Sequence, residues 1–267
     1  MSDSQLVAPD DTIVTLAHAK LRNRVVCLAG VLVGTSGLAW CTIHYLAPVS
    51  DSDDSNLIGR IGVILVGLAG WHLTQWLIGS KAVEDQEKAA ATGVALTDSD
   101  RVLQATAPVN RYLLNHPKCA NALLVVSSAF IDQLGVFLLL WTVVGPSLRP
   151  FVGLLILFGL RQVCQALTAL PPPSGMIWRY PGFPSIFVTY GVSNDLFFSG
   201  HTALAVYGAV ELARLGNVWL LALGIAIVVF EITTVLVLRA HYTLDVFTGL
   251  IAALFVAGVT MNLGFAS

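Results

Sequence analysis

Charged residues are scarce in this chain of 267 residues. Asp, Glu, Lys and Arg make up only 11% of it, against about 25% in soluble domains, while 56% of the residues are hydrophobic and the mean hydropathy is +0.78. This composition excludes a soluble globular enzyme and a disordered chain. The scarcity is greatest in residues 121–267, which hold five arginines, five acidic residues and no lysine. We therefore expect most of this segment to lie in a membrane.

Clusters of positive charge and closely spaced cysteines are also missing. Fourteen Lys and Arg nearly balance sixteen Asp and Glu, so the chain offers nucleic acid no clustered basic face. Cys27, Cys41, Cys119 and Cys164 share no C-x-x-C spacing, and cysteines in apolar segments usually pack as small hydrophobes. We therefore expect no nucleic-acid partner, no disulfide framework, no metal site and no cofactor.

Long apolar runs fill most of the chain instead. A transmembrane helix needs about 20 predominantly apolar residues, whereas barrel strands alternate in polarity and an open sheet cannot satisfy its backbone in lipid. The sequence therefore predicts an all-α, polytopic membrane helix bundle, integral to a bacterial inner membrane or a eukaryotic endomembrane. The expected spans are residues 25–46, 57–79, 123–144, 151–170, 196–215, 218–238 and 242–263.

The chain divides into three expected parts. Residues 1–24 form a polar tail, residues 25–120 contain N-terminal helices and an interfacial segment, and residues 121–267 form the catalytic helical core. A long loop, residues 171–195, opens with three prolines that end the preceding helix abruptly. Because Trp and Tyr prefer the membrane interface, the aromatic residues of this loop predict a rigid cap at the level of the lipid headgroups.

Two short segments place histidines at the starts of expected spans. S-G-H-T occupies residues 199–202, and R-A-H-Y-T-L-D occupies residues 239–245. Because the fifth span crosses the membrane and the sixth crosses back, both segments lie on the same face. The two histidines can therefore meet.

The neighbours of each histidine suggest its chemistry. On a continuous helix, His241 and Asp245 share a face, so the carboxylate can fix one imidazole nitrogen and leave the other as a nucleophile or base. Ser199 and Gly200 at a helix start offer backbone N–H groups and the positive end of the helix dipole, which suit a phosphate. Arg239 can hold the same anion with a charge-assisted fork.

Three further residues complete the candidate site. His201 can protonate a leaving oxygen. Asp195 can steer a cationic headgroup, can tune His201, or is simply a helix N-cap. Arg161 lies inside an expected span, where an unpaired charge is costly. It either forms an ion pair with Asp132 or Glu231 or binds a headgroup.

These motifs resemble the lipid phosphatase and phosphotransferase superfamily typified by type 2 phosphatidic acid phosphatases, and most closely its sphingomyelin synthase branch. That branch has an aspartate six residues before the histidine of S-G-H-T and then H-Y-T-x-D-V, which Asp195 and residues 199–202 and 241–246 match. The F-F-S-G-H and R-G-H-Y-T-I-D motifs of plant phosphatidylcholine:diacylglycerol cholinephosphotransferases are similar to residues 197–201 and 239–245.

The resemblance implies a six-helix core, to which this chain adds one N-terminal helix, and a metal-free transfer of a phospho-headgroup from a phospholipid to the hydroxyl of diacylglycerol or ceramide. His241 would attack phosphorus to form a phosphohistidine, and Asp245 would orient it. His201 would protonate the departing alkoxide and then deprotonate the acceptor. The phosphatases' K-x6-R-P motif is missing, which argues against a simple phosphatase. A lipid phosphate phosphatase, a phospholipase C-like hydrolase and a non-enzymatic lipid transporter stay open as alternatives.

The distribution of Lys and Arg predicts an orientation. If the seven spans insert with the N-terminus inside, ten of these residues lie on the cytoplasmic side and three, Arg60, Arg149 and Arg214, lie outside. Lys and Arg are enriched in cytoplasmic loops. The bias therefore predicts that the histidine segments lie on the cytoplasmic face.

Overall fold

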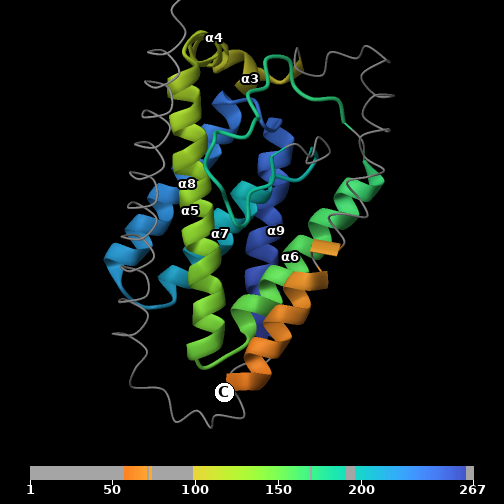
Figure 1. Cartoon of the computed structure of the whole chain (residues 1–267), viewed down its shortest axis with the longest axis vertical. Coiled ribbons are helices and arrows are strands. Elements are labelled where there is room, and N and C mark those ends of the chain that lie inside the picture. The colour runs from red at the N-terminus through yellow and green to blue at the C-terminus, as the bar shows by residue number, and fades with distance from the viewer. Residues whose placement is uncertain (1–56, 71, 74–98, 169, 191–195, 263–267) are drawn as a thin grey trace, which may run out of the picture.

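The computed structural model describes residues 57–70, 72–73, 99–168, 170–190 and 196–262. These residues form helices and irregular connections and contain no strand, which confirms the predicted all-α membrane helix bundle (Figure 1). In chain order the helices are Leu57–Gly70, α3 (Arg101–Ala105), α4 (Ala107–Asn115), α5 (Pro117–Val144), α6 (Arg149–Leu167), α7 (Gly200–Ala213), α8 (Val218–Val237) and α9 (Thr243–Asn262).

Three helices of the described part, α5, α8 and α9, are long and apolar enough to cross a membrane. Helix α7 is shorter than the expected span 196–215, because residues 196–199 precede it in irregular backbone and Ser199 caps it. Its 14 residues extend about 21 Å, less than the hydrocarbon core of a bilayer. The expected span 25–46 lies outside the described residues, so the count of seven spans stays a prediction.

Helices α3 and α4 lie across one end of the bundle, above α5 in Figure 1. The Asp100 carboxylate caps α3 by accepting hydrogen bonds from the N–H groups of Val102 and Leu103, both at 3.1 Å. Pro108 and Pro117 stand in the first turns of α4 and α5, where a missing N–H breaks no helical hydrogen bond. Helices α3 and α4 fall largely within residues 102–121, the segment that the sequence predicts to be interfacial.

Helix α7 lies at the centre of the bundle and packs against α5, α6, α8 and α9. Small residues allow this close packing. A Cβ on Gly153 of α6 would come within 1.9 Å of the Tyr207 hydroxyl, and one on Gly208 would come within 3.0 Å of Leu134. Tyr207 itself is fully buried. The first turn of α7, which carries His201, therefore faces protein on most sides.

The opposite end of the bundle gathers the three arginines that the sequence predicts to lie outside. Arg149 pairs with the fully buried Glu211 at 3.0 Å, and Arg214 pairs with the same carboxylate. Arg214 also donates to the carbonyl of Ala257 at 3.0 Å, and Arg60 donates to the carbonyl of Gly145. These contacts join α6, α7 and α9 at the end remote from α3 and α4.

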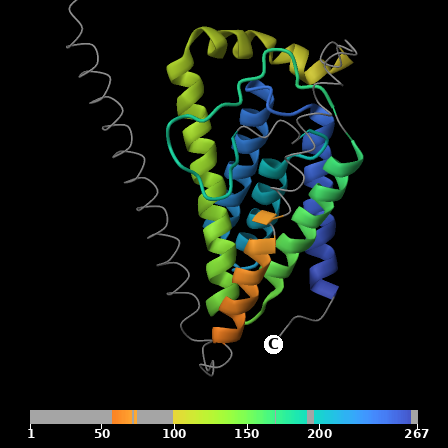
Figure 2. The same cartoon turned by 45° about the vertical axis from the view of Figure 1, so that its right-hand side comes forward.

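The described part of the long loop, residues 170–190, enters the bundle (Figures 1 and 2). Asp132, midway along α5, accepts hydrogen bonds from the N–H groups of Ile186 at 3.1 Å and Phe187 at 2.9 Å and from the Ser185 hydroxyl at 2.7 Å. Irregular backbone at this depth is tolerated where protein surrounds it and satisfies its polar groups. The expected cap at headgroup level is therefore wrong for residues 185–187, and we call residues 170–190 the re-entrant loop.

Candidate functional site

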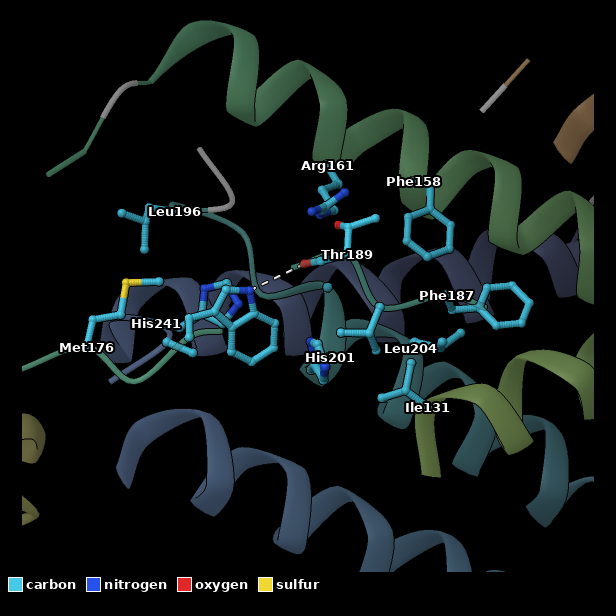
Figure 3. A pocket seen from close by; sticks show the side chains of 14 residues that line it. Ile131, Phe158, Arg161, Met176, Phe187, Thr189, Leu196, His201, Leu204 and His241 are labelled. Carbon is cyan, nitrogen blue, oxygen red and sulfur yellow. Dashed lines mark hydrogen bonds between the residues drawn. The ribbon is translucent and has the colours of Figure 1, made fainter. Parts of the chain in front are cut away.

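A pocket between the re-entrant loop, α6, α7 and the α8–α9 connection contains both histidines (Figure 3). The space between its walls, open solvent at its mouth included, is about 630 Å³. His201, His241, Arg161 and Gly200 line it, and most of its other walls are apolar. The structure thus brings the two histidine segments together, as the topology argument predicts.

Backbone contacts hold the two segments against each other. The N–H of Ser199, the N-cap of α7, donates to the carbonyl of Asp245 in the first turn of α9 at 3.0 Å. A Cβ at Gly249, one turn further along α9, would come within 2.6 Å of the Ser199 carbonyl oxygen. Only glycine permits this approach, so the sequence at position 249 helps to set the spacing of the site.

His241 lies just before α9 and not within a continuous helix. Asp245 still reaches it, because α9 begins with a capping arrangement in which the third helical residue turns back toward the N-cap. Its Oδ2 accepts from the N–H of Tyr242 at 2.9 Å and lies 3.3 Å from Nδ1 of His241. Both side chains are buried. The Asp245 carboxylate therefore contacts Nδ1 of His241, and Nε2 is the ring nitrogen that it does not contact.

His201 extends from the first turn of α7 into the same pocket. Its ring meets the ring of Trp178 edge to face, with centroids 5.2 Å apart. The side chain is 8% exposed, and no described residue forms a hydrogen bond with its buried Nε2. A buried polar atom without a partner is costly in a closed protein interior, and His201 lines the pocket, so a water molecule or a ligand there would relieve this cost.

Trp178 is itself fixed by the re-entrant loop. Its indole N–H donates to the carbonyl of Thr189 at 3.4 Å, the dashed line in Figure 3, and its ring packs against Tyr190 at 5.0 Å. The Tyr190 hydroxyl contacts the hydroxyl of Ser128 and donates to the carbonyl of Leu124 at 3.3 Å. These contacts attach the end of the re-entrant loop to α5.

Arg161 lies on the α6 side of the pocket and is 6% exposed. Its Nε is 3.2 Å from the place that a Cβ on Gly200 would occupy, so the guanidinium packs directly over the start of α7. The two acidic partners suggested by the sequence are engaged elsewhere. Asp132 binds the re-entrant loop, and Glu231 accepts from the Ser127 hydroxyl at 2.6 Å.

Arg239 points away from this pocket in the structure. Its guanidinium donates to the carbonyl of Ser174 and, at 3.2 Å, to the carbonyl of Leu103, and Arg239 is not among the residues that line the pocket. Its backbone adopts a φ of 54°, which turns the chain between α8 and His241. The expected contact between Arg239 and the anion is therefore absent from this arrangement, and its side chain links α3 to the re-entrant loop.

Two other candidates have different outcomes. Ser199 is fully buried, and its hydroxyl accepts from the N–H of Thr202 at 3.3 Å, so it acts here as the cap of α7. Asp195 lies outside the described residues. Within the described part of the chain, no group of three or more His, Cys, Asp or Glu side chains could hold a metal ion.

Comparison with known proteins places the chain in a family. A family model described as "AtPDCT1/2" matches residues 99–262, which contain every candidate site residue. The chain belongs to this family. A curated relative, phosphatidylcholine:diacylglycerol cholinephosphotransferase 1 of Arabidopsis thaliana, is 27% identical over 145 residues, which are 54% of this chain and 46% of the relative. No solved structure matches the chain.

Family membership agrees with the resemblance of the histidine motifs to plant cholinephosphotransferases. The wider resemblance to type 2 phosphatidic acid phosphatases and sphingomyelin synthases stays a prediction. The matched stretch of the curated relative is less than half of its length, so what that enzyme does is a hypothesis for this chain.

Asp100 is a contributor that the motifs do not reveal. Besides capping α3, its carboxylate accepts from the N–H of Thr243 at 2.8 Å and from the Thr243 hydroxyl at 2.7 Å. Partial burial opposes ionisation of this carboxyl, but the hydrogen bonds from Thr243 and the α3 amides outweigh it and lower its pKa. An aspartate before a helix predicts an N-cap. The contact of Asp100 with Thr243, 143 residues further along the chain, could not be predicted from any local sequence pattern.

Proposed function

We propose that this protein is a multi-pass membrane phosphotransferase that moves a phosphorylated headgroup from a phospholipid to the hydroxyl of diacylglycerol. The name of the curated relative suggests phosphocholine as the headgroup and phosphatidylcholine as the donor. The observation that carries the proposal is the joint presence of His201, His241 and Arg161 in one pocket, with Asp245 behind His241. No acidic side chain is among the described residues that line this pocket, so its electrostatics favour an anion.

In the first half-reaction, Nε2 of His241 attacks the phosphorus of the donor. The bond from phosphorus to the diacylglycerol oxygen breaks, and His201, protonated while the anionic substrate is bound, gives its Nε2 proton to that oxygen. A phosphohistidine and free diacylglycerol result. Asp245 holds Nδ1 of His241 and offsets the positive charge that the ring acquires.

In the second half-reaction, the acceptor hydroxyl attacks the phosphohistidine. His201, now neutral, takes the hydroxyl proton, the new P–O bond forms, and His241 leaves as the free imidazole. Arg161 and the N–H groups at the start of α7 would stabilise the charge on the phosphoryl oxygens in both steps; this role is supported by the presence of Arg161 and Gly200 side by side in the pocket wall.

The remaining candidates act through position. Ser199 caps α7 and docks it on α9, and Arg239 fixes the turn that presents His241. For Asp195 we retain the hypothesis that it steers a cationic headgroup or tunes His201.

Product analysis tests this function. Purified protein in vesicles receives phosphatidylcholine labelled in its choline group, with or without diacylglycerol of a different acyl composition, and in parallel with ceramide. We expect labelled phosphatidylcholine that carries the new acyl chains, dependent on added diacylglycerol and absent in His241→Ala. Labelled sphingomyelin would make ceramide the acceptor. Release of free phosphocholine as the sole product would indicate a hydrolase, and no labelled product of any kind would contradict an enzymatic function.

A further inference from the structure

A second pocket adjoins the first on the side away from His241. Phe158 and Phe187 line both pockets, and in Figure 3 they lie at the end of the first pocket opposite His241 and Met176. The second pocket encloses about 330 Å³, open space included. Its other walls are Gly67 and Leu68, Leu139 of α5, and Phe151, Leu154 and Leu155 of α6. Every described wall is therefore apolar or glycine.

One face of α6 connects the two pockets. Phe151, Leu154, Phe158 and Arg161 follow one another at intervals of three or four residues, so they share a face of the helix. At 1.5 Å per residue, the row from Arg161 to Phe151 is about 15 Å long. This row of side chains is cationic at Arg161, beside the histidines, and apolar at Phe151, its far end. An elongated molecule with an anionic head and an apolar tail matches this order.

The wall between the pockets is held in place by polar contacts. The Phe187 N–H donates to Asp132 at 2.9 Å, and its ring lies where a Cβ on Gly135 would be, 2.4 Å from the nearest ring atom. The re-entrant loop thus fixes Phe187 at mid-depth in the bundle. A chain that leaves the first pocket passes this ring before it reaches the second.

We propose that the second pocket binds one acyl chain of the donor phospholipid while its phosphate lies between Arg161 and the two histidines. This inference rests on the proposed function, because it uses the same phosphate position. A chain that moves from bilayer to pocket gains little from the hydrophobic effect, since lipid tails are as apolar as the pocket walls. The pocket therefore acts by fixing the length and direction of the chain, which aligns phosphorus with Nε2 of His241.

Photocrosslinking tests the location directly. Phosphatidylcholine with a diazirine at the end of one acyl chain is incorporated at trace level into lipid nanodiscs that hold the full chain, irradiated, and its adducts are mapped by mass spectrometry. We expect adducts on Phe151 and Leu154, which line the second pocket and are only 2% and 4% exposed. Adducts confined to exposed positions of α6, such as Val163 at 55% exposed, would overturn the proposal.

A matched pair of variants tests selectivity. Leu139 lines the second pocket, whereas the adjacent Leu140, also half-buried, lines neither pocket. Leu139→Phe should remove most of the Leu154 adduct and shift the kcat/KM ratio of long-chain over short-chain donors by about tenfold, and Leu140→Phe should change neither. Equal behaviour of the two variants would contradict the proposal. Crosslinking needs no turnover, so failure of the transfer assay with adducts still on Leu154 would refute the proposed function and not the chain-binding pocket.

Discussion

Replacement of Asp100 should have two effects that can be measured separately, a loss of folding stability and a displacement of His241 in the pocket. Its carboxylate accepts two hydrogen bonds from α3 and two from Thr243, which lies two residues after His241. An Asp100→Asn side chain can still cap α3 with its oxygen, but its amide N–H groups then face the Thr243 N–H. Loss of one charge-assisted hydrogen bond costs about 1.5–3 kcal/mol, and Asp100→Ala loses roughly a further 1 kcal/mol of helix capping.

The effect on turnover should exceed the effect on stability. His241 depends on the segment between Arg239 and Thr243 for its place, and a shift of about 1 Å in a reacting group can cost on the order of 100-fold in rate. We therefore expect Asp100→Ala to lower kcat for headgroup transfer by 10- to 100-fold in protein that is still folded. The assays are thermal unfolding in detergent and the transfer assay on the same preparation.

Asn217 supplies the matched control. It caps α8, accepting from the N–H groups of Trp219 at 2.8 Å and Leu220 at 3.4 Å, at the end of the bundle remote from the histidines. Asn217→Ala should lower the unfolding temperature by an amount similar to the loss of the α3 cap and leave kcat unchanged. If both variants lower kcat alike, or if Asp100→Ala lowers only stability, the alignment argument is refuted.

The Asp100 carboxylate also determines the direction in which stability should change with pH. Its pKa in the folded protein lies below its ordinary value of 3.8, so the stabilisation that it provides is present above pH 3.8 and is lost as the pH falls through the folded pKa. The difference in unfolding temperature between wild type and Asp100→Asn should therefore be constant near neutrality and shrink on acidification below that value. A difference that grows on acidification would contradict this assignment.

Three further predictions concern the pocket and the membrane. His241→Ala should abolish the acid-labile phosphoryl-enzyme and transfer, whereas His201→Ala should slow both half-reactions by about 10²- to 10⁴-fold; mapping of the phosphate to His201, or full turnover by His241→Ala, would reverse the roles. Arg161→Lys keeps the charge but loses the guanidinium fork, so the KM for donor phospholipid should rise while folding is retained; wild-type kinetics with every donor would exclude a headgroup role. In a variant without native cysteines, cysteines at Ser147 and Ser174, which flank α6, should be labelled from opposite sides of the membrane, Ser174 from the cytoplasmic side if the positive-inside bias holds; labelling of both from one side would contradict a crossing by α6.

The sequence predicted those features of the fold and of the site that depend on local residue patterns or on the way successive spans cross the membrane in opposite directions. Apolar runs predicted the all-α bundle, and the order of spans predicted that the segments around His201 and His241 meet. The start of α7 was less accurate, because hydropathy cannot see that residues 196–199 precede it, whereas the expected span 242–263 begins within one residue of α9. A capping arrangement preserved the contact between His241 and Asp245, although the helical geometry assumed for it is absent.

Contacts between distant segments were beyond the reach of local patterns. The position of Arg239 two residues before His241 suggested a charge-assisted contact with the same anion, but in the structure its φ is 54° and its guanidinium meets Ser174 and Leu103. Asp132 was considered as a partner for Arg161 because both were expected inside spans. Its actual partners are backbone N–H groups of residues 186 and 187, which no hydropathy or charge pattern marks.

The anchoring of residues 185–187 by Asp132 constrains how the protein is made. A helix can enter the bilayer alone because its backbone is satisfied within the segment, but irregular backbone cannot. The Asp132 carboxylate is likewise unstable midway along α5 until the N–H groups of residues 186 and 187 donate hydrogen bonds to it. Assembly is therefore ordered: α5 and its neighbours insert first, and the loop then folds inward onto a prepared acceptor. Because Trp178 and Phe187 belong to this loop and line the pocket around the histidines, we expect a stage of assembly in which the protein is already integrated into the membrane and the pocket is still incomplete.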